Sequence, residues 1–600
     1  MKKRSLSLLL ALLMVLSLVM PGTAAFADTV SAETPADASD TELKWANKLG
    51  TDWMNATSVP TVADDGVIVM VGTTINKLSF ENGEIIASGN MSSSPSYGYT
   101  PAVVNGDKII APLGKGTLEA FDAKTLESKW SVSDELAGQA LSPVLCADGK
   151  AYTGFWNGEA KDANFVCVDT ATGKLLWSYT VKGGFYWAGA AEVGSYVVVA
   201  TDDGENGTKG TSSLLVFKKT YAENEEVKPV SSVELAGCGD ARSSITVDGG
   251  KVYFTTKGGY FYSVQMNGTT FDRGSLKAVQ LRNSNGAIGM STSTPVVYNG
   301  RAYVGVSGSS QFTAYSGHSI TVIDLGAWDV AYSVPTMGYP QTSGLLTAGD
   351  DGAAYVYFFD NYTPGILRVL KDQPGQTSAE LENENGHSVG YALFTPMGDQ
   401  AQYAICSPIV DKYGTLYFKN DSGYLMALTS AVTSAEVTKL PQTDYTYNES
   451  FDPTGMELTV TYANGMSRKL PACRTIGGVT VKYATWDSKV LQKDDEGAFF
   501  IDYPYASYYY YETDLVDEKP IEAVTLLVTV NKNRKGDVNG DGVTDVYDLQ
   551  RLYEHCCGIA PFKEDGTELE DAGLKDNILE VQNLYSRLTT GRWDSSEKTE

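Results

Sequence analysis

Histidine and cysteine are scarce in this sequence, with three His and seven Cys among 600 residues. So few thiols exclude a disulfide-rich scaffold, and no Cys-x-x-Cys-His motif is present to attach a haem. Basic residues are also few. The sequence has 46 Lys and Arg but 73 Asp and Glu, which gives a net charge of −27. An acidic surface repels nucleic-acid phosphates and anionic lipids, so we expect neither as a partner.

Long apolar runs are missing beyond the N-terminal segment. The exception, residues 6–20, follows the basic start MKKR and precedes AFA at 25–27. This pattern predicts a secretory signal peptide at residues 1–27, and therefore a secreted, extracellular or cell-surface protein. An uncleaved membrane anchor is the alternative, but the run is short for a bilayer span, and no other membrane span is expected.

Glycine and tyrosine, in contrast, are abundant, with 60 and 36 residues. Glycine suits tight turns and tyrosine suits half-buried strands, so the composition predicts a mainly β chain. A chain of 600 residues is too long for one ordinary core, and about two to four domains are expected.

A repeated pattern runs through residues 42–430. DAKTLESKW at 122–130 aligns at every position with DTATGKLLW at 169–177, 47 residues later. Each copy follows a Thr-Pro or Ser-Pro pair, a Gly turn and an apolar run, and openings of this kind occur eight times. Repeats of this length predict propeller blades, because a four-stranded blade buries its faces only against neighbouring blades. We therefore predict an eight-bladed β-propeller.

The motif D-x-x-T-G-x-x-x-W at 169–177 resembles the PQQ-like repeat of quinoprotein-type propellers. The resemblance implies that these residues are architectural. Trp130 and Trp177 are expected to dock one blade on the next, while Asp169 and Gly173 shape a turn.

Closure of the ring has its own candidate. LKW at 43–45 is similar to the end of a repeat, yet it precedes the first opening. We expect it to add the outer strand to the last blade, residues 416–428, and so to join the two ends of the propeller.

The propeller region offers no clear catalytic motif. Quinoprotein dehydrogenases of this fold use a vicinal cystine, a metal-bound cofactor and an acidic base, whereas the cysteines here are not adjacent: Cys146, Cys167, Cys238 and Cys406. A sugar-cleaving site needs paired carboxylates, and acidic residues are too plentiful here to single out a pair. We therefore name no catalytic residue and no redox cofactor, although glycosidase or lyase activity stays open.

Residues 434–531 follow a different pattern. FDPTGMELTVTYANG at 451–465 alternates apolar and polar residues before an Asn-Gly turn, which predicts a half-buried strand and a hairpin. The string resembles bacterial Ig-like modules of secreted surface proteins, which implies a β-sandwich that acts as a spacer. Tyrosines at 503, 505 and 508–511 suggest a platform for sugar rings, with packing on the sandwich as the alternative.

The sharpest motif is DVNGDGVTDVYD at 537–548. Oxygen donors fall at loop positions 1, 3, 5, 9 and 12, and Gly at position 6 permits the turn that wraps them round an ion. The alternative, an acidic turn without metal, leaves the carboxylates repelling one another. We therefore predict a Ca²⁺ site, with Val543 binding through its carbonyl and Asp545 directly or through water. The predicted ligands are Asp537, Asn539, Asp541, Val543, Asp545 and Asp548.

The Asp at position 12, and a loop that no helix precedes, make residues 535–592 resemble a dockerin. This small α-helical, EF-hand-like calcium module plugs proteins into cohesin-bearing scaffolds. The resemblance implies a cohesin-bearing or cell-surface partner. Dockerins are duplicated, and one helical face, Leu549, Leu552, Tyr553 and Cys556, does recur 32 residues later as Val581, Leu584, Tyr585 and Leu588.

The second loop of this module is degenerate. It keeps only Asp571, Asp576 and Glu580, with altered spacing, so we expect a weak or empty second calcium site there. On the first helix, Cys556 and Cys557 point in directions about 100° apart, so we expect a core residue and a free thiol rather than a disulfide.

The whole chain is predicted to be mainly β and modular. The expected order is a signal peptide (1–27), a linker (28–41), an eight-bladed propeller (42–430), an Ig-like sandwich (434–531), a dockerin-like module (535–592) and a tail (593–600). This order suggests an extracellular, non-catalytic binding protein of polysaccharide utilisation, whose propeller presents a surface to a glycan or protein. The alternatives are a glycan-cleaving propeller enzyme delivered by the dockerin, and an adhesin or protein-assembly scaffold.

Overall fold

The computed structural model describes most of the chain from residue 28 onward. The described residues are 28–205, 207–308, 314–349, 351–446, 450–476, 478–483, 485–486, 499–502, 524–526, 529–531, 536–539, 543–562, 574 and 578–590. The expected signal peptide and the tyrosines at 503–511 lie outside these ranges. Two compact units are distinguished: Met1–Ala431 with Ile476–Val479, and Val432–Thr475 with Thr480–Glu600.

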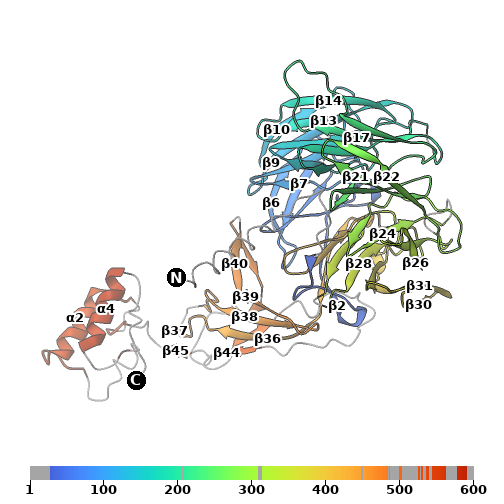
Figure 1. Ribbon diagram of the computed structural model, residues 1–600. Helices are drawn as coiled ribbons and strands as arrows, with labels where there is room; N and C mark the ends of the chain where they lie inside the picture. Colours follow the sequence, from blue (N-terminus) through green and yellow to red (C-terminus); the bar gives the residue numbers. More distant parts are fainter. Residues whose placement is uncertain are drawn as a thin grey trace, which may run out of the picture. The chain divides into compact units, whose positions relative to one another are not determined.

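The first unit is built from antiparallel sheets (Figure 1). Six of them are meanders of four consecutive strands, which we number along the chain. The first sheet contains β3 (Thr61–Val62), β4 (Val67–Val71), β5 (Thr74–Leu78) and β6 (Ile85–Asn90). The second contains β7 (Val103–Asn105), β8 (Lys108–Leu113), β9 (Thr117–Asp122) and β10 (Ser128–Ser133). The third contains β11 (Leu145–Ala147), β12 (Lys150–Gly154), β13 (Asp162–Asp169) and β14 (Leu175–Lys182).

The next three meanders repeat this plan. The fourth sheet contains β15 (Ala191–Val193), β16 (Tyr196–Ala200), β17 (Ser212–Lys218) and β18 (Ser231–Leu235). The fifth contains β19 (Thr246–Asp248), β20 (Lys251–Thr256), β21 (Tyr260–Asn267) and β22 (Thr270–Gln280). The sixth contains β23 (Val296–Tyr298), β24 (Arg301–Val306), β25 (Ser319–Asp324) and β26 (Asp329–Pro335).

The last two sheets of this unit recruit strands from its N-terminal end. The seventh contains β27 (Leu345–Ala348), β28 (Ala354–Phe359), β29 (Leu367–Asp372), β32 (Ala392–Phe394) and, parallel to β27, β1 (Asp28–Thr29). A hairpin of β30 (Leu381–Glu384) and β31 (His387–Gly390) precedes β32. The eighth contains β33 (Ile409–Val410), β34 (Leu416–Lys419), β35 (Tyr424–Ser430) and β2 (Thr41–Lys48).

The core of this unit lies between its sheets. The middle strands, such as β8 and β9, are buried along almost their whole length, whereas the outer strand β10 alternates between half-buried and exposed residues. Each sheet shares a hydrophobic cluster with the next one along the chain. The eighth shares one with the first, through Trp45 and Tyr417 against Val67 and Leu78. Neighbouring sheets therefore stabilise one another by burying apolar area.

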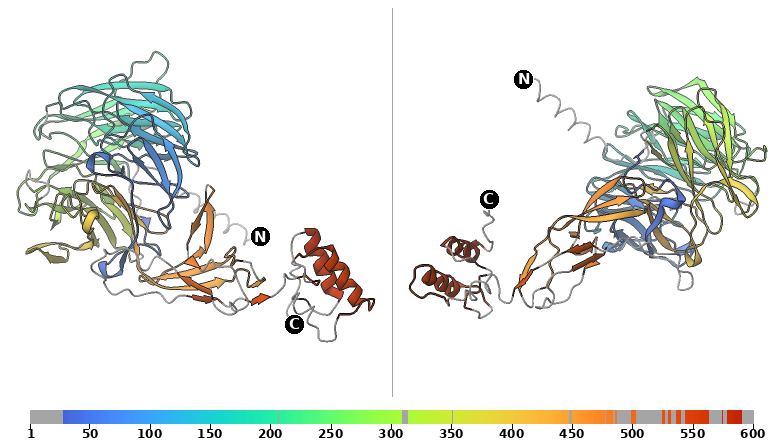
Figure 2. Two further views of the ribbon diagram at one scale, coloured as in Figure 1. Left: turned by 180° about the vertical axis from the view of Figure 1, so that it is seen from behind. Right: turned by 90° about the horizontal axis from the view of Figure 1, so that it is seen from below.

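The expected closing strand is present. Strand β2 pairs with β35 in the register Leu43 with Leu428 and Trp45 with Ala427. The indole Nε1 of Trp45 donates to the carbonyl oxygen of Phe80 on the first sheet, at 3.1 Å. In Figures 1 and 2 the colours change gradually from one sheet to the next, while the blue strand β2 lies beside the later strands.

Residues 28–41, expected as a linker, also belong to this unit. Strand β1 pairs with β27, and Glu33 is fully buried with its carboxylate 2.8 Å from Lys44 Nζ. The short 3₁₀ helix η1 (Ala38–Asp40) leads into β2. This segment therefore packs against the seventh and eighth sheets.

The repeated motif forms a repeated turn. The amide of Gly173 donates to the carbonyl oxygen of Asp169 at 2.9 Å, and the Asp169 carboxylate accepts from the amides of Ala171 and Thr172. Trp130 donates to the Thr170 carbonyl of the next sheet. The architectural roles expected for these residues are confirmed, and Trp177 likewise packs on the fourth sheet, in its hydrophobic cluster.

The second unit combines short strands with two α-helices among its described residues. A three-stranded sheet contains β36 (Val432–Lys439), β38 (Glu457–Tyr462) and β39 (Ser467–Pro471). The strand at 457–462 and the turn after it therefore form as predicted. The other pairings are β37 (Asp444–Thr446) with β45 (Thr529–Asn531), β40 (Cys473–Ile476) with β41 (Val479–Lys482), and β42 (Thr485–Trp486) with β43 (Phe499–Asp502) and β44 (Val524–Leu526).

The helices α2 (Val546–Cys556) and α4 (Ile578–Thr590) pack on each other through a small core. Leu552 and Leu584, which are 32 residues apart, are both fully buried in it. Cys556 contributes a partly buried side chain, while Cys557 is exposed, and neither is disulfide-bonded. Among the described residues, neither α-helix has the length and apolar content needed to cross a membrane.

Candidate functional site

Three features of the described residues are candidates for function: the acidic loop before α2, the groove between α2 and α4, and one face of the first unit. The acidic loop folds back on itself. The Asp548 carboxylate, which is fully buried in the first turn of α2, accepts from the amides of Val538 and Asn539 at 2.8 and 3.1 Å. The first and last predicted ligands, Asp537 and Asp548, are both buried at this closure.

Asp545 completes the start of the helix. Its side chain accepts from the amide of Tyr547 at 2.8 Å, and its own amide donates to Asp548 at 2.7 Å, which makes a capping box. Because a carboxylate has about four lone-pair sites, the three amides on Asp548 leave it about one free site. Asp548 therefore closes the loop and caps the helix in addition to its predicted role as a ligand.

The donor set of the loop fits Ca²⁺. Its potential ligands are carboxylate, amide and carbonyl oxygens with no imidazole or thiolate, and Ca²⁺ takes six to eight such oxygens. Asn539 is exposed and the backbone of Val543 lies in the described part of the loop, whereas Asp541 lies outside it. When bound, the ion would neutralise the acidic loop and tie its two ends together.

The second predicted site is only partly visible. Glu580 lies in the first turn of α4, is 8% exposed, and accepts from the Asn583 side chain at 3.3 Å. Asp571 and Asp576 lie outside the described residues, so their placement relative to Glu580 is not described.

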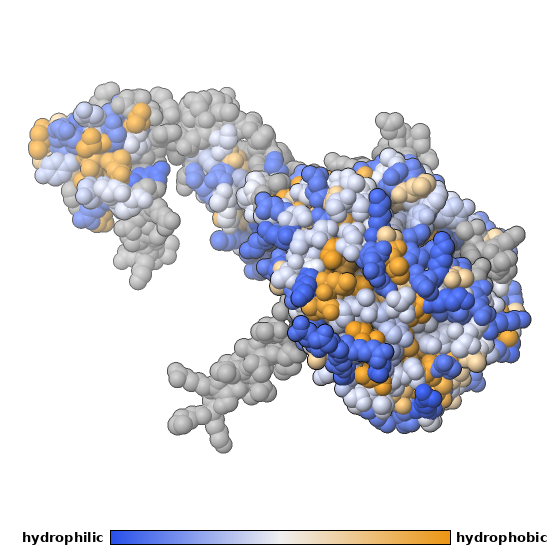
Figure 3. Space-filling view, turned by 90° about the horizontal axis from the view of Figure 1, so that it is seen from above, coloured by the Kyte–Doolittle hydropathy of each residue, from blue (hydrophilic) through white to orange (hydrophobic). Residues whose placement is uncertain are grey.

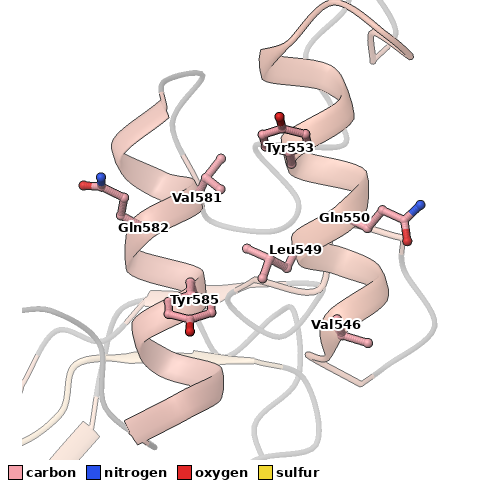
Figure 4. Close-up of a pocket in the computed structure, with 7 residues that line it drawn as sticks. All are labelled: Val546, Leu549, Gln550, Tyr553, Val581, Gln582 and Tyr585. Carbon is pink, nitrogen blue, oxygen red and sulfur yellow. The ribbon is translucent and has the colours of Figure 1, made fainter.

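A groove of about 420 Å³ runs between α2 and α4 (Figure 4). Its walls carry the same residue types at the 32-residue offset, and Figure 4 shows Leu549 and Val581 pointing between the helices. The lining residues are Val546, Leu549, Gln550, Tyr553, Val581, Gln582 and Tyr585. The tyrosines at 553 and 585 are 50% and 59% exposed, so they border the groove rather than join the core.

Large apolar side chains are therefore exposed around the helix pair. Val546 is 61% exposed and Tyr547 is 67% exposed. Apolar surface that stays in contact with water beside a groove commonly marks a protein-binding site. Sequence reasoning found the duplicated helix face but did not separate its buried leucines from its exposed tyrosines.

An arc of six aromatic side chains lies on one face of the first unit. Trp53 of η2 (Trp53–Asn55) precedes the first sheet, and Tyr97 with Tyr99 precedes the second. Trp156 follows β12, and Tyr186 with Trp187 precedes the fourth sheet. In an antiparallel sheet the first strand begins at the same end at which the second strand finishes. The loops that precede first strands and the loop that follows β12 therefore lie on one face of the unit. We call this set the aromatic arc: Trp53, Tyr97, Tyr99, Trp187, Tyr186 and Trp156.

Consecutive rings of the aromatic arc touch one another. The centroid distances, in the order above, are 6.2, 6.1, 6.0, 4.9 and 5.0 Å. Trp53 is 51% exposed, Tyr97 is 40% exposed, and the other four are partly buried. Lys419 Nζ lies 5.3 Å from the Tyr99 ring centre, and burial raises the pKa of Tyr99 to about 12, so its hydroxyl stays neutral.

A buried charge cluster lies beside the aromatic arc. The Arg242 guanidinium stacks 4.4 Å from the Tyr186 ring and contacts Glu159, Asp202 and Asp240 at 2.6, 2.8 and 3.2 Å. Burial raises the pKa of Asp202, while Arg242 opposes the rise. Oxygens of the three carboxylates lie within 4.8 Å of one another. Two cations contact them: Arg242, and Lys257, whose Nζ lies 2.7 Å from Asp240. The cluster therefore holds three loops together through its ion pairs.

The buried thiols of this unit are poor nucleophiles. Burial raises the pKa of Cys146 and of Cys167 to about 12. Both thiols therefore stay protonated at neutral pH, and the thiolate is the reactive form.

Comparison with known proteins identifies the first unit. A family model described as outer membrane protein assembly factor BamB matches residues 19–184 and 147–331, which together span more than half of the chain. The chain belongs to the BamB family. Its first unit is accordingly a PQQ-like β-propeller, as the repeat predicted.

Individual relatives of this BamB-family chain are distant. The solved structure of BamB from Moraxella catarrhalis is 14% identical, and the match covers 65% of this chain and 97% of that one with a TM-score of 0.44. Quinohemoprotein alcohol dehydrogenase from Comamonas testosteroni is 13% identical over 70% of this chain and 80% of its own, with a TM-score of 0.47. The dehydrogenase subunit of a quinone alcohol dehydrogenase from Gluconobacter oxydans (strain 621H) is 31% identical over 87 residues, which are 14% of this chain and 11% of that protein.

Proposed function

We propose that this protein is an extracellular, non-catalytic binding protein. In this proposal the propeller presents a ligand-binding face, and a calcium-dependent C-terminal module attaches the molecule to a partner. The observation that carries it is the acidic loop whose two ends meet at the buried Asp548, next to a groove rimmed by exposed apolar residues. Secretion through the predicted signal peptide at 1–27 and a role in polysaccharide utilisation belong to the same proposal.

We infer further that the eight sheets are the blades of an eight-bladed propeller. The cyclic order of the hydrophobic clusters and the pairing of β2 with β35 support this number. We also infer that residues 434–531 form an Ig-like spacer. The three-stranded sheet of β36, β38 and β39 supports a sandwich in this region.

The dockerin-like assignment of residues 535–592 rests on the pseudo-symmetry of the helix pair. Leu552 and Leu584 occupy equivalent places in the core, and Tyr553 and Tyr585 occupy equivalent places at the rim. A cohesin-bearing scaffold or a cell-surface protein of the same type is the proposed partner. Its apolar side chains would cover the rim of the groove.

Binding of the full chain to a purified cohesin domain, with and without a chelator, tests this function. We expect binding in Ca²⁺, loss of binding in EDTA, and at least tenfold weaker binding of the double variant Tyr553→Ser and Tyr585→Ser. Tyr403→Ser is the matched control, because Tyr403 is 40% exposed and belongs to the first unit rather than to the helix pair. Binding that is unchanged in EDTA, or that is unchanged in the double variant, would contradict the proposal.

Membership of the BamB family favours a second candidate, a protein-assembly scaffold. The family is described as an outer membrane assembly factor, which supports a protein ligand for the propeller. The glycan-cleaving alternative is not supported by the buried carboxylates, because Asp202 is held on Arg242 and is 2% exposed. New reducing ends or unsaturated products after incubation with plant or mucin glycans would favour the enzyme.

A further inference from the structure

We propose that the aromatic arc binds a neutral oligosaccharide or polysaccharide chain. This inference rests on the proposed function, because it names the ligand class of the propeller face. The arc combines a flat aromatic surface, a rigid frame and a surplus of hydrogen-bond acceptors. Each of these properties selects for the same ligand.

The exposed aromatic surface is formed by the stacked rings of Trp53 and Tyr97. Their planes differ by 11°, their centroids are 6.2 Å apart, and about half of Trp53 and two fifths of Tyr97 are in contact with solvent. A ligand that covers exposed aromatic rings removes their apolar surface from water, and this stabilises the complex. A sugar ring presents apolar C–H groups on its faces and hydroxyls at its edge. It can therefore cover the aromatic rings while its hydroxyls remain free to bond.

The frame holds the rings in place before any ligand arrives. Asp52 caps η2 by accepting from the amides of Met54 and Asn55 at 2.9 and 3.2 Å. Tyr97 has a left-handed backbone with φ of 59°, and a Cβ on the following Gly98 would lie 2.8 Å from the Thr57 carbonyl oxygen. Such conformations are unfavourable for a bulky residue and persist where the surroundings enforce them. A preorganised platform loses less entropy on binding.

Trp187, at the other side of the arc, has a left-handed backbone like that of Tyr97. Its φ is 58°, and its ring contacts both Tyr99 and Tyr186. The backbone carbonyl of Trp187 also accepts a hydrogen bond from Ser244 at 3.3 Å. The arc is therefore fixed at both sides.

The polar groups beside the arc are mostly acceptors. Asp52 adjoins Trp53 in the sequence and is exposed. Asp421 lies close enough to Tyr99 to raise the pKa of its hydroxyl. Glu159 contacts Arg242, and the Arg242 guanidinium stacks on the Tyr186 ring. The cations beside the arc, Arg242 and Lys419, are paired with Asp202 at 2.8 Å and Asp421 at 3.8 Å. Ionised carboxylates accept hydrogen bonds and donate none, so they suit a ligand rich in hydroxyl donors.

This excess of acceptors distinguishes a glycan from other ligands. An anionic polymer is repelled by the carboxylates and by the net charge of −27. A proline-rich peptide also stacks on aromatic grooves, but its backbone offers carbonyl acceptors, which need donors from the protein. The neutral glycan is the ligand whose chemistry complements both the rings and the carboxylates.

Isothermal titration of the full chain with cellohexaose, xylohexaose and mannohexaose tests the proposal. We expect at least one hexasaccharide to bind, and we expect the binding to weaken roughly tenfold in Trp53→Ala and again in Tyr97→Ala. Both side chains are exposed, so the variants should fold, which circular dichroism would verify. Tyr547→Ala on the helix pair is the control and should bind as the unchanged protein does.

The failure of this proposal is distinguishable from failure of the proposed function. No binding of any neutral hexasaccharide, or binding that survives both substitutions, would overturn the glycan site. Binding of decaproline that is lost in Trp53→Ala would also overturn it, while keeping the propeller as a ligand-binding module. Calcium-dependent attachment through the helix pair is measured separately on the same preparation.

Discussion

Single residues in this propeller act where the backbone turns and where charge is buried. The turn at Asp169 needs a left-handed fifth residue, and Gly173 supplies it with φ of 74°. Leu126 and Trp328 take the same place in other copies, with φ of 58° and 57°. The role of Gly173 could be predicted from its motif. The equivalent turn at Trp328 could not, because glycine is absent from that copy.

Replacing Gly173 with Ala should destabilise the propeller more than replacing Gly149 with Ala. Both glycines have a left-handed backbone, but a Cβ at 173 would lie 2.7 Å from the Trp130 ring, whereas a Cβ at 149 would meet nothing within 4 Å. The free energies of unfolding of the two variants should differ by about 1–3 kcal/mol, because only the Cβ at 173 clashes with a neighbouring side chain. Calorimetric melting of the two variants measures it. Equal losses would show that the contact between neighbouring sheets tolerates the extra methyl group.

Asp411 should make the stability of the propeller depend on pH. Burial, with Glu33 nearby, raises the pKa of Asp411 from 3.8 to about 6. Between these values the folded chain holds a proton that the unfolded chain has released, so the free energy of unfolding falls as the pH rises through this window. The fall is on the order of 3 kcal/mol.

The variant Asp411→Asn removes this titration while keeping the oxygen that accepts from the amides of Tyr413 and Thr415. Its melting temperature should therefore change less than that of the unchanged chain between about pH 4 and pH 7. Asp324→Asn is the control, because backbone hydrogen bonds lower the pKa of Asp324, so its titration lies below this window and the variant should keep the pH profile of the unchanged chain. A parallel pH profile for Asp411→Asn and the unchanged chain would contradict the expectation.

At the scale of elements, the propeller depends on strands contributed from both ends of its sequence. The pairing of β2 with β35 could be predicted because residues 43–45 carry a repeat ending without a repeat of their own. The aromatic arc could not, because its six rings come from four loops with no shared spacing. The packing of residues 28–41 was missed for a similar reason, since a short polar segment carries no periodic signal.

Replacing Trp45 with Ala should weaken this closure. Trp45 is 4% exposed, bonds to Phe80 and packs on Tyr417, so truncation should cost about 3–5 kcal/mol and lower the melting temperature. Trp53→Ala provides the matched control, because that indole is half exposed and its loss should leave the melting temperature nearly unchanged. Equal melting temperatures for Trp45→Ala and Trp53→Ala would show that the contacts of Trp45 do not stabilise the closure by β2.

At the scale of the whole molecule, the chain joins a large β unit to a smaller unit that ends in helices. Hydrophobic residues on the visible face of the β unit form separate patches within a mostly hydrophilic or neutral surface (Figure 3). The mainly β fold and the propeller could be predicted from the sequence because repeats are a local pattern, whereas the Ig-like and dockerin-like modules stay predictions. The ligands could not be predicted, because binding faces are assembled from loops that the fold brings together.

Calorimetric titration of the full chain with Ca²⁺ tests the central claim most directly. We predict uptake of one ion with a dissociation constant of about 10⁻⁶ M or lower, and an accompanying rise in helical circular dichroism. Asp537→Ala should abolish the uptake, whereas Asp399→Ala, in the exposed turn η3 (Gly398–Gln400) of the propeller, should not. Absence of heat up to millimolar Ca²⁺, or equal uptake by the Asp537 variant, would contradict the account.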